Sequence, residues 1–523
     1  MSKQLLTQWG FIPLWLLLTA SLLFRQPIPI DETRYFTVAW EMWLRGDFLV
    51  PYLNGQTYSH KPPLLFWLMT SGWGLLGFNE WWPRLVGPLC ALINLLLTRK
   101  IATKLWPEHT EVALLAPWIL LATLLWTLFA TSTMFDTLLT NWVLLGMLGL
   151  LEISTGSIGK GWIYLGLAIG LGILAKGPVI FLHLLPTAIL VSLWFKPVSY
   201  RVWFAYLLLA ILAGVAVALS WALPAANQGG AAYADAILWH QTADRTVGTK
   251  IHARAFYWYL PFLPLLLFPW ISWPRLWQSW RATQLSADHG LRFCLIWFLS
   301  ILVLFSLLPS KQLHYLIPML PAFALLAARS LSLNLPSSSL KSELVLPLIM
   351  ALIGLLLICL PVIPGLSKLN WVQNVEPFWG LSTTTIALIL LSVTVYQRQL
   401  SVFAVSSAVI TAIFIGFICF FQYTGLAYNL VPAAQQVAEF NQQHIPYAFV
   451  GNYQGQLHYL GRLTQPIPII ASEQAKEWVM QHPGGYLISL ENKPAAATTY
   501  QQLHREDWLI FRNAQQVLQQ FEP

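Results

Sequence analysis

Charged residues are scarce in this 523-residue sequence, where only 10% are Asp, Glu, Lys or Arg and 57% are hydrophobic. A soluble globular protein carries about a quarter charged residues, so this chain lacks the polar surface needed to cover itself in water. The mean hydropathy is +0.60. Because apolar runs long enough to cross a bilayer recur through residues 1–424, the sequence predicts a polytopic membrane protein surrounded by membrane lipids.

Cysteine is also rare, which excludes a protein built on disulfides. The four cysteines, Cys90, Cys294, Cys359 and Cys419, lie inside apolar segments and have no CxxC spacing. The formal net charge of +8 raises the question of nucleic acid. Lys and Arg are dispersed among the apolar runs, however, and form no basic stripe, so nucleic acid is not expected as a partner.

Apolar length and flanking charge predict about thirteen membrane-spanning helices in an all-α bundle. They begin near residues 9, 84, 112, 136, 162, 178, 202, 257, 291, 312, 344, 380 and 401. Basic residues recur in the short connections after every second helix, and by the positive-inside rule these connections and the N-terminus are cytoplasmic. The residues concerned are Arg99, Lys100, Lys104, Lys160, Lys196, Arg201, Arg275, Arg281, Arg329, Lys341 and Arg398.

The opposite side of the plasma (inner) membrane then receives the longer loops, at about residues 25–83 and 225–256. In the first of these loops, residues 32–44 carry apolar side chains at helical spacing, and residues 64–76 form an apolar stretch too short to span comfortably. Both segments are predicted to be helices that lie along the membrane surface.

Residues 425–523 are more polar than residues 1–424 and are predicted to form a separate periplasmic or extracellular α/β domain. Its expected strands cover residues 447–450, 467–470, 486–490 and 508–511, and a helix is expected at residues 473–481. This domain shows no phosphate loop and no clear catalytic triad. A docking or lid function is therefore the favoured interpretation, and residues 1–424 are expected to form the functional transmembrane domain.

Many ionisable residues fall at the outer helix ends or in the outer loops of this topology. Such groups at an apolar boundary are energetically costly, so each needs a structural partner or a function. If these residues were distributed over both sides of the membrane, interfacial anchoring would explain them. Because they all lie on the outer side, we predict that they form a single site. The group comprises Asp31, Glu32, Arg34, His60, Lys61, Asp136, Lys176, His240, Arg245, Lys311 and His314.

The acids of this group have two interpretations. Asp31 and Glu32 open the first predicted surface helix, where carboxylates often cap free N–H groups. Alternatively, a carboxylate held beside lipid is suited to act as a general base, because desolvation and a neighbouring cation set its pKa. Asp136, at the start of the fourth predicted span, carries the same two alternatives.

The cations are equally ambiguous from sequence. Lys61 and Lys311 lie at predicted membrane boundaries, where lysine usually anchors lipid headgroups but also serves as a phosphate ligand. Turn chemistry explains the Gly and Pro after Lys176, but not a cation at that depth. His60 and His240 could bind a divalent metal such as zinc, although two distant histidines do not make a metal-binding spacing.

Taken in order, these residues resemble the GT-C membrane glycosyltransferases, and within them the aminoarabinose transferase of lipid A and the protein O-mannosyltransferases. The resemblance rests on an ordered set of short motifs in residues 1–424 and on the predicted architecture. The motifs are Asp31-Glu32-Thr33-Arg34-Tyr35, Tyr58-Ser59-His60-Lys61-Pro62-Pro63, Asp136, Lys176-Gly177, His240 with Arg245, and Ser310-Lys311 with His314, Tyr315 and Pro318.

The resemblance implies a polyprenyl-phosphate sugar donor and a lipid, glycan or protein acceptor on the non-cytoplasmic face. It implies that Asp31 is catalytic with Glu32 beside it, and that Lys61, Arg245, Lys311 and Arg34 bind the donor phosphate. Further site candidates are Tyr35, Tyr58, Asp136, Lys176, His314 and Tyr315. In the aminoarabinose enzyme a glutamate precedes the motif lysine and takes part in a metal site. Here that residue is His60, and His240 resembles the loop histidine of that metal site, so zinc bound by these two imidazoles stays an open expectation. Trp239 precedes His240 where the aminoarabinose enzyme has a glutamate, so lipid A and aminoarabinose are not carried over as substrates.

The chemistry agrees with this interpretation. Cations fixed in a low-dielectric cavity stabilise the negative charge of a departing polyprenyl phosphate, and Asp31 could remove the proton of an acceptor hydroxyl. The alternative is a transporter or flippase of polyprenyl-linked saccharides, suggested by the many helices and cations. A transporter typically shows inverted repeats and broken helices at mid-membrane, and the sequence indicates neither.

Overall fold

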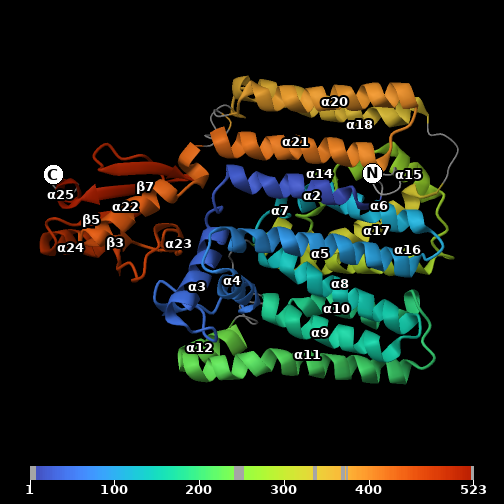
Figure 1. Ribbon diagram of the computed structural model, residues 1–523, viewed down its shortest axis with the longest axis horizontal. Helices are drawn as coiled ribbons and strands as arrows, with labels where there is room; N and C mark the ends of the chain where they lie inside the picture. The colour runs from blue at the N-terminus through green and yellow to red at the C-terminus, as the bar shows by residue number, and fades with distance from the viewer. Residues whose placement is uncertain are drawn as a thin grey trace.

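The computed structural model describes residues 8–240, 253–333, 339–366, 372, 375–423 and 425–519. The described chain forms a bundle of long, roughly aligned helices with a small sheet-containing part at one end (Figure 1). The predicted fold class, an all-α polytopic bundle followed by a small α/β region, is therefore confirmed.

Nine helical segments of the described residues are long and apolar enough to cross a membrane. They lie close to nine of the thirteen predicted starts. These segments are α5 (Trp81–Leu105), α8 (Phe135–Ser154), α9 (Ile158–Lys176), α11 (Tyr200–Gly229), α16 (His289–Leu307), η7 with α17 (Leu313–Leu331), α18 with η8 (Leu340–Val362), α20 (Pro377–Gln397) and α21 (Val402–Tyr423).

Shorter apolar helices account for three more of the predicted starts. They are α2 with η1 (Phe11–Phe24), α6 (Thr110–Leu121) and α10 (Ile180–Ile189). The helix predicted to begin near residue 257 is wrong as a continuous span. The chain there forms the short pieces η5 (Leu260–Phe262), α14 (Leu263–Leu266), η6 (Trp270–Ser272) and α15 (Pro274–Arg281). Four prolines in this stretch remove backbone donors and interrupt the helix.

Small residues allow α8 and α9 to pack closely. A Cβ placed on Gly149 of α8 would lie 2.7 Å from the carbonyl oxygen of Gly161 on α9. A Cβ on Gly161 would in turn lie 2.5 Å from the carbonyl oxygen of Gly149. Glycine pairs of this kind let membrane helices approach until their backbones touch. The contact holds together α8, which carries Asp136 at its start, and α9, which carries Lys176 at its end.

The two predicted surface helices are both present. Helix α3 (Asp31–Arg45) begins at Asp31 and ends at Gly46, whose φ of 62° is a conformation that glycine adopts without strain. A short antiparallel hairpin of β1 (Tyr52–Leu53) and β2 (Gln56–Thr57) follows, and then α4 (Leu64–Leu76). Figure 1 shows α3 and α4 at the end of the bundle that faces the sheet, out of line with the long helices.

The C-terminal part contains a five-stranded sheet in the order β4-β3-β5-β7-β6. Strand β3 pairs in parallel with β4 and β5, whereas β7 pairs antiparallel with β5 and β6. The strands are β3 (Tyr447–Val450), β4 (Ile469–Ile470), β5 (Tyr486–Glu491), β6 (Tyr500–His504) and β7 (Asp507–Asn513). The four predicted strands are thus confirmed, and β6 was missed because its sequence, Tyr-Gln-Gln-Leu-His, has no apolar run.

Helices cover both faces of this sheet. Helix α22 (Val431–Gln442) packs against one face, where alternate residues of the strands form a core with Val437 and Phe440. Helices α24 (Ala475–Gln481) and α25 (Ala514–Gln519) cover the other face. Helix α24 confirms the helix predicted at residues 473–481. The proposed domain boundary at residues 424/425 remains a prediction, because residue 424 lies outside the described residues.

Candidate active site

Asp31 opens α3 and is the more accessible of its two neighbouring acids. Its side chain is 46% exposed. Arg34 Nη2 donates to Asp31 Oδ1 at 2.5 Å, and the Tyr35 hydroxyl donates to the same oxygen at 3.2 Å. Burial raises the pKa of Tyr35 well above its ordinary value, and the Asp31 charge raises it further. Tyr35 therefore keeps its proton and orients the carboxylate as a hydrogen-bond donor.

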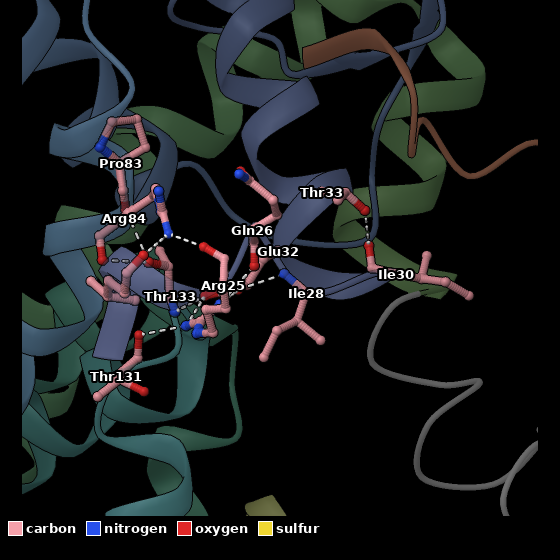
Figure 2. Close-up of polar contacts among 11 residues, drawn as sticks. Arg25, Gln26, Ile28, Ile30, Glu32, Thr33, Pro83, Arg84, Thr131 and Thr133 are labelled. Carbon is pink, nitrogen blue, oxygen red and sulfur yellow. Dashed lines mark hydrogen bonds and ion pairs between the residues drawn. The ribbon is translucent and has the colours of Figure 1, made fainter. Parts of the chain in front are cut away.

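Glu32 has a different environment, although it is adjacent in sequence. Its side chain is 3% exposed and forms an ion pair with Arg25, with Nη1 2.6 Å from Oε2. The backbone amide of Ile28 donates to Oε2 and that of Thr133 donates to Oε1, both at 2.7 Å. Figure 2 shows Glu32 surrounded by these groups. Both oxygens are engaged, so Glu32 joins α3 to the segment before α8.

Two buried arginines reinforce the same junction, and the sequence analysis did not identify either. Arg25 Nη2 also donates to the Thr131 carbonyl at 2.9 Å. Arg84 of α5 donates to the carbonyl oxygens of Leu22 and Arg25 (Figure 2). The end of the first helix, α3, α5 and the start of α8 are consequently linked by charge-assisted hydrogen bonds. Short spacing to an acid could have identified Arg25, which precedes Glu32 by seven residues.

Phe135 is the centre of the packing around Lys61. The Lys61 ammonium lies 5.4 Å from the centroid of the Phe135 ring. Tyr35 and Phe66 contact the same ring edge-to-face, with centroids 4.8 and 5.6 Å away. Tyr58 is buried and its ring lies 6.2 Å from that of Phe66. One aromatic side chain at the start of α8 thus brings together α3, α4 and the segment that carries Lys61.

Asp136 and Lys176 form a buried ion pair between the ends of α8 and α9. Lys176 Nζ donates to Asp136 Oδ1. The side chain of Lys176 is 7% exposed and that of Asp136 is 3% exposed. His314 Nε2 lies 3.9 Å from Asp136 Oδ2. The Tyr315 ring lies 4.7 Å from Lys176 Nζ. The acid predicted as a cap or site residue is therefore bound to a cation from another helix.

The start of α8 connects this pair to the first part of the site. Asp136 follows Phe135 in α8, and the Phe135 ring contacts both Lys61 and Tyr35. The structure therefore brings together, at one end of the bundle, most of the predicted candidates. They are Asp31, Arg34, Tyr35, Tyr58, Lys61, Asp136, Lys176, His314 and Tyr315.

Lys311 is oriented differently from the other cations. Its side chain is 3% exposed, and its ammonium donates to the backbone carbonyls of Arg254, at 3.1 Å, and Leu308. Burial lowers its pKa. In this conformation Lys311 joins the segment before η7 to the chain near residue 254, and the contacts described for its ammonium are to carbonyl oxygens.

Two predicted residues lie outside what the structure describes. Arg245 belongs to residues 241–252, and the side chain of His240, at the end of η3 (Ala236–His240), is also outside the described part. His60 is exposed and stacks on Tyr58 with centroids 5.3 Å apart. No group of three or more His, Cys, Asp or Glu side chains suited to a metal occurs among the described residues. The described residues alone therefore do not make up a zinc site.

The C-terminal part also reaches this site, through contacts that the sequence analysis did not identify. Arg34 Nη1 donates to the Gln454 side-chain oxygen at 3.0 Å, across 420 positions of sequence. Thr37 Oγ1 donates to the Gly455 carbonyl at 2.6 Å. The site thus lies where α3 meets the loop after β3, and a single glutamine in a polar segment gives no local signal of such a contact.

Comparison with known proteins agrees with this fold. The family model described as dolichyl-phosphate-mannose-protein mannosyltransferase matches residues 60–221. The undecaprenyl phosphate-alpha-4-amino-4-deoxy-L-arabinose arabinosyl transferase of Pseudomonas aeruginosa (strain UCBPP-PA14) is 31% identical over 365 residues. That match covers 66% of this chain and 63% of the relative, so the chain matches less than two thirds of the relative's length.

Solved structures share the fold over almost the whole chain. ArnT from Cupriavidus metallidurans in the apo state has a TM-score of 0.75 at 18% identity, covering 97% of this chain and 98% of that one. The same protein bound to undecaprenyl phosphate has a TM-score of 0.72 at 20% identity, covering 96% and 98%. At these identities the likeness establishes the fold.

The fold of this chain is that of a multi-pass membrane protein of the GT-C type. Within that class it is ArnT-like, related to the undecaprenyl phosphate-aminoarabinose transferases and the dolichyl-phosphate-mannose-protein mannosyltransferases. The resemblance inferred from its motifs is thereby confirmed.

Proposed function

We propose that this protein is a membrane glycosyltransferase that moves a sugar from a polyprenyl-phosphate donor to a lipid, glycan or protein acceptor. The observation that carries the proposal is the arrangement around Asp31. An accessible carboxylate is oriented by Arg34 and Tyr35, with Lys61 and the Asp136–Lys176 pair at the same end of the bundle. An acid and several cations beside lipid suit a reaction in which an acceptor hydroxyl is deprotonated and the charge of a departing donor phosphate is stabilised.

The donor class is supported by the relatives. The Pseudomonas aeruginosa relative is named for an undecaprenyl phosphate-linked sugar, and the Cupriavidus metallidurans structure contains undecaprenyl phosphate. A hexosyl- or pentosyltransferase that uses such a donor is therefore the reaction class proposed. The departures at His60 and around His240 argue against transferring the relative's particular sugar to this chain.

The orientation in the membrane is part of the proposal. Lys104 and Lys160 share Glu152 at the end of the bundle opposite to Asp31, at distances of 2.7 and 3.4 Å. The positive-inside rule favours placing these lysines on the cytoplasmic side. The N-terminus is then cytoplasmic, and Asp31 and the C-terminal sheet face the periplasm or the exterior.

In the proposed reaction the acceptor oxygen attacks the anomeric carbon of the donor sugar while the glycosyl–phosphate bond breaks. Asp31 removes the proton of an acceptor hydroxyl. The contacts that the described chain makes to this carboxylate both fall on Oδ1, so we assign Oδ2 as the oxygen that takes the proton. The bonding electrons leave with the polyprenyl phosphate, whose charge Lys61 stabilises in a low-dielectric setting. Direct displacement inverts the anomeric centre.

The remaining predicted residues divide by environment. Glu32 is proposed to position α3 through Arg25 instead of contacting the substrate, because its oxygens are engaged. Lys311 is buried and directs two of its three N–H donors at backbone carbonyls, so we rank it below Lys61 as a phosphate ligand. Arg245 as a phosphate ligand, and zinc bound by His60 and His240, stay predictions, and no step is assigned to a metal.

The experiment is a transfer assay with purified protein, a polyprenyl-phosphate sugar and envelope lipids or glycans as acceptors. We expect release of polyprenyl phosphate, and we expect Asp31→Asn to lower kcat by a factor of about 10² to 10⁴, as for loss of a general base. Thin-layer or mass-spectrometric quantification of the released lipid measures this rate. Mass spectrometry of lipids and glycoconjugates from a deletion strain would identify the sugar and its acceptor.

Glu376→Gln is the matched control, because Glu376 is an exposed acid that precedes α20 and plays no part in the proposed site. It should retain wild-type turnover. Full activity of Asp31→Asn would remove Asp31 as the base. The transporter alternative predicts a different result, namely movement of an intact polyprenyl-linked saccharide across reconstituted vesicles without cleavage of its glycosyl–phosphate bond.

A further inference from the structure

The loop after β3 contacts the candidate active site directly. In this loop Gln454 Oε1 accepts a hydrogen bond from Arg34 Nη1 at 3.0 Å, and Arg34 Nη2 donates to Asp31 Oδ1 at 2.5 Å. The guanidinium also lies 5.5 Å from the centroid of the Tyr35 ring. A single planar group thus joins a residue of the C-terminal part to the proposed catalytic carboxylate.

The loop around Gln454 is held firmly at this position. Gly455, the next residue, has a φ of 75°, and a Cβ there would lie 2.4 Å from the Leu53 side chain and 3.2 Å from that of Thr37. Its carbonyl accepts the Thr37 hydroxyl at 2.6 Å. Only glycine allows the loop to approach α3 this closely without strain.

The Gln454 side chain is itself oriented by its neighbours. Its Nε2 donates to Asn452 Oδ1 at 2.8 Å, which leaves Oε1 directed at Arg34. The Gln454 backbone amide donates to the side chain of Gln456, which is buried. Because both the nitrogen and the oxygen of the Gln454 side-chain amide have defined partners, the acceptor oxygen has a fixed position before any substrate binds.

Further contacts anchor the C-terminal part on the same elements. Trp40 Nε1 donates to the Leu463 carbonyl at 2.9 Å. Asn54 and Ile467 exchange two hydrogen bonds, at 2.9 and 2.8 Å. The helix that presents Asp31 and the hairpin that leads to Lys61 therefore rest on the C-terminal part, which Figure 1 places next to α3 at this end of the bundle.

We propose that Gln454 is a positioning residue for sugar transfer, which fixes the plane of the Arg34 guanidinium and through it the direction of the Asp31 carboxylate. This inference rests on the proposed function of Asp31. Arg34 has several rotatable bonds, and with the Asp31 contact alone its guanidinium could turn about that single bond. A second anchor removes this freedom, and the geometry of a general base strongly affects its rate.

The decisive experiment compares Gln454→Ala with the exposed-surface variant Gln435→Ala in the full-length protein. We expect Gln454→Ala to lower kcat about tenfold with little change in the KM for the donor, because Lys61, which stabilises the donor phosphate in the proposed reaction, is untouched. Gln435→Ala on α22 should behave as wild type. Gln454→Glu retains an acceptor oxygen at this position and should recover most of the lost kcat.

A double-mutant cycle separates positioning from a general effect on folding. If Gln454 acts through Arg34, adding Gln454→Ala to an Arg34→Gln variant should cause no further loss of kcat. An equal loss in both backgrounds would overturn the proposal, as would unchanged kcat in the single variant. Gly455→Ala keeps the glutamine at position 454 but displaces the loop that carries it. This variant should therefore reproduce the kcat defect.

A readout that needs no substrate distinguishes failure of this inference from failure of the proposed function. Modification of Arg34 by phenylglyoxal, quantified by mass spectrometry of its peptide, should accelerate several-fold in Gln454→Ala and remain unchanged in Gln435→Ala. Equal rates in the two variants would overturn the positioning proposal. If wild-type protein shows the protection of Arg34 but releases no polyprenyl phosphate from any donor, the proposed function fails and the contact itself stands.

Discussion

At the scale of single residues, Asp31 and Glu32 show how two neighbouring acids can lie in different environments. Successive residues of a helix point about 100° apart. Glu32 consequently points into the bundle toward Arg25 and the Thr133 amide, whereas Asp31 points to the accessible side of α3. The sequence predicted both acids as catalytic, and the environment of each separates a positioning acid from a candidate base.

The Arg25–Glu32 ion pair gives a prediction at this scale. Glu32→Gln would leave Arg25, which is 6% exposed, as a buried cation without its carboxylate partner. Breaking such a buried pair costs about 3–5 kcal/mol. A thermal unfolding experiment in detergent should therefore show a large loss of stability for Glu32→Gln.

The matched control for that variant is Glu80→Gln. Glu80 is 67% exposed and pairs with Arg462 at 2.5 Å, and exposed pairs contribute about 0–1 kcal/mol. Its melting temperature should stay close to that of wild type. Equal stability of Glu32→Gln and Glu80→Gln would contradict the structural function assigned to Glu32.

At the scale of elements, the approach of α8 to α9 sets the distance between Asp136 and Lys176. Each helix presents a glycine to the backbone of the other, and the ion pair forms at the ends of these helices. The helices themselves were predictable from long apolar runs. Their contact was not, because it depends on which faces of the two helices meet.

Gly149→Val tests this contact. The added side chain would collide with the Gly161 carbonyl, force the helices apart and weaken the Asp136–Lys176 pair, so both the melting temperature and the transfer rate should fall. Gly159→Val on α9 has open space around its Cβ position and should leave the transfer rate unchanged, although it lies two residues from Gly161. Unaltered activity of Gly149→Val would show that the spacing is not critical.

At the scale of the whole molecule, the C-terminal part and the bundle meet at the candidate site. The sequence predicted a docking or lid module, and the hydrogen bonds from Arg34, Thr37, Trp40 and Asn54 to the C-terminal part agree with a docked arrangement. Its stability therefore bears on the geometry at Asp31.

Two buried histidines make that stability depend on pH. Burial lowers the pKa of His458 and of His504 to about 4, below the ordinary value of 6.5. Between these values the unfolded chain binds more protons than the folded chain, so the free energy of unfolding falls as the pH drops from about 6.5 to about 4. Each histidine contributes up to about 3 kcal/mol to this loss.

Hydrogen exchange measured by mass spectrometry, corrected for intrinsic rates, should show that β3, β5 and β7 lose protection across this pH range. His504→Leu should flatten the pH dependence relative to wild type. Exchange that is independent of pH from 7 to 4.5 would contradict the prediction.

The sequence by itself determined the fold class of this protein and the end of the bundle where its candidate site lies. Composition, apolar run length and charge placement are local properties, and they survive in any conformation that keeps the chain in a bilayer. The motif order around Asp31, Lys61, Asp136 and Lys176 was sufficient to suggest the GT-C resemblance.

Only the tertiary structure decided what each group does there. It paired Asp136 with Lys176, engaged Glu32 with Arg25, turned Lys311 toward backbone carbonyls and placed Gln454 on Arg34. These outcomes depend on which side of each helix faces its neighbours and on contacts between residues as far apart as 420 positions in the sequence. No local pattern encodes such contacts, because they arise when separately formed elements pack together and satisfy one another's buried charges.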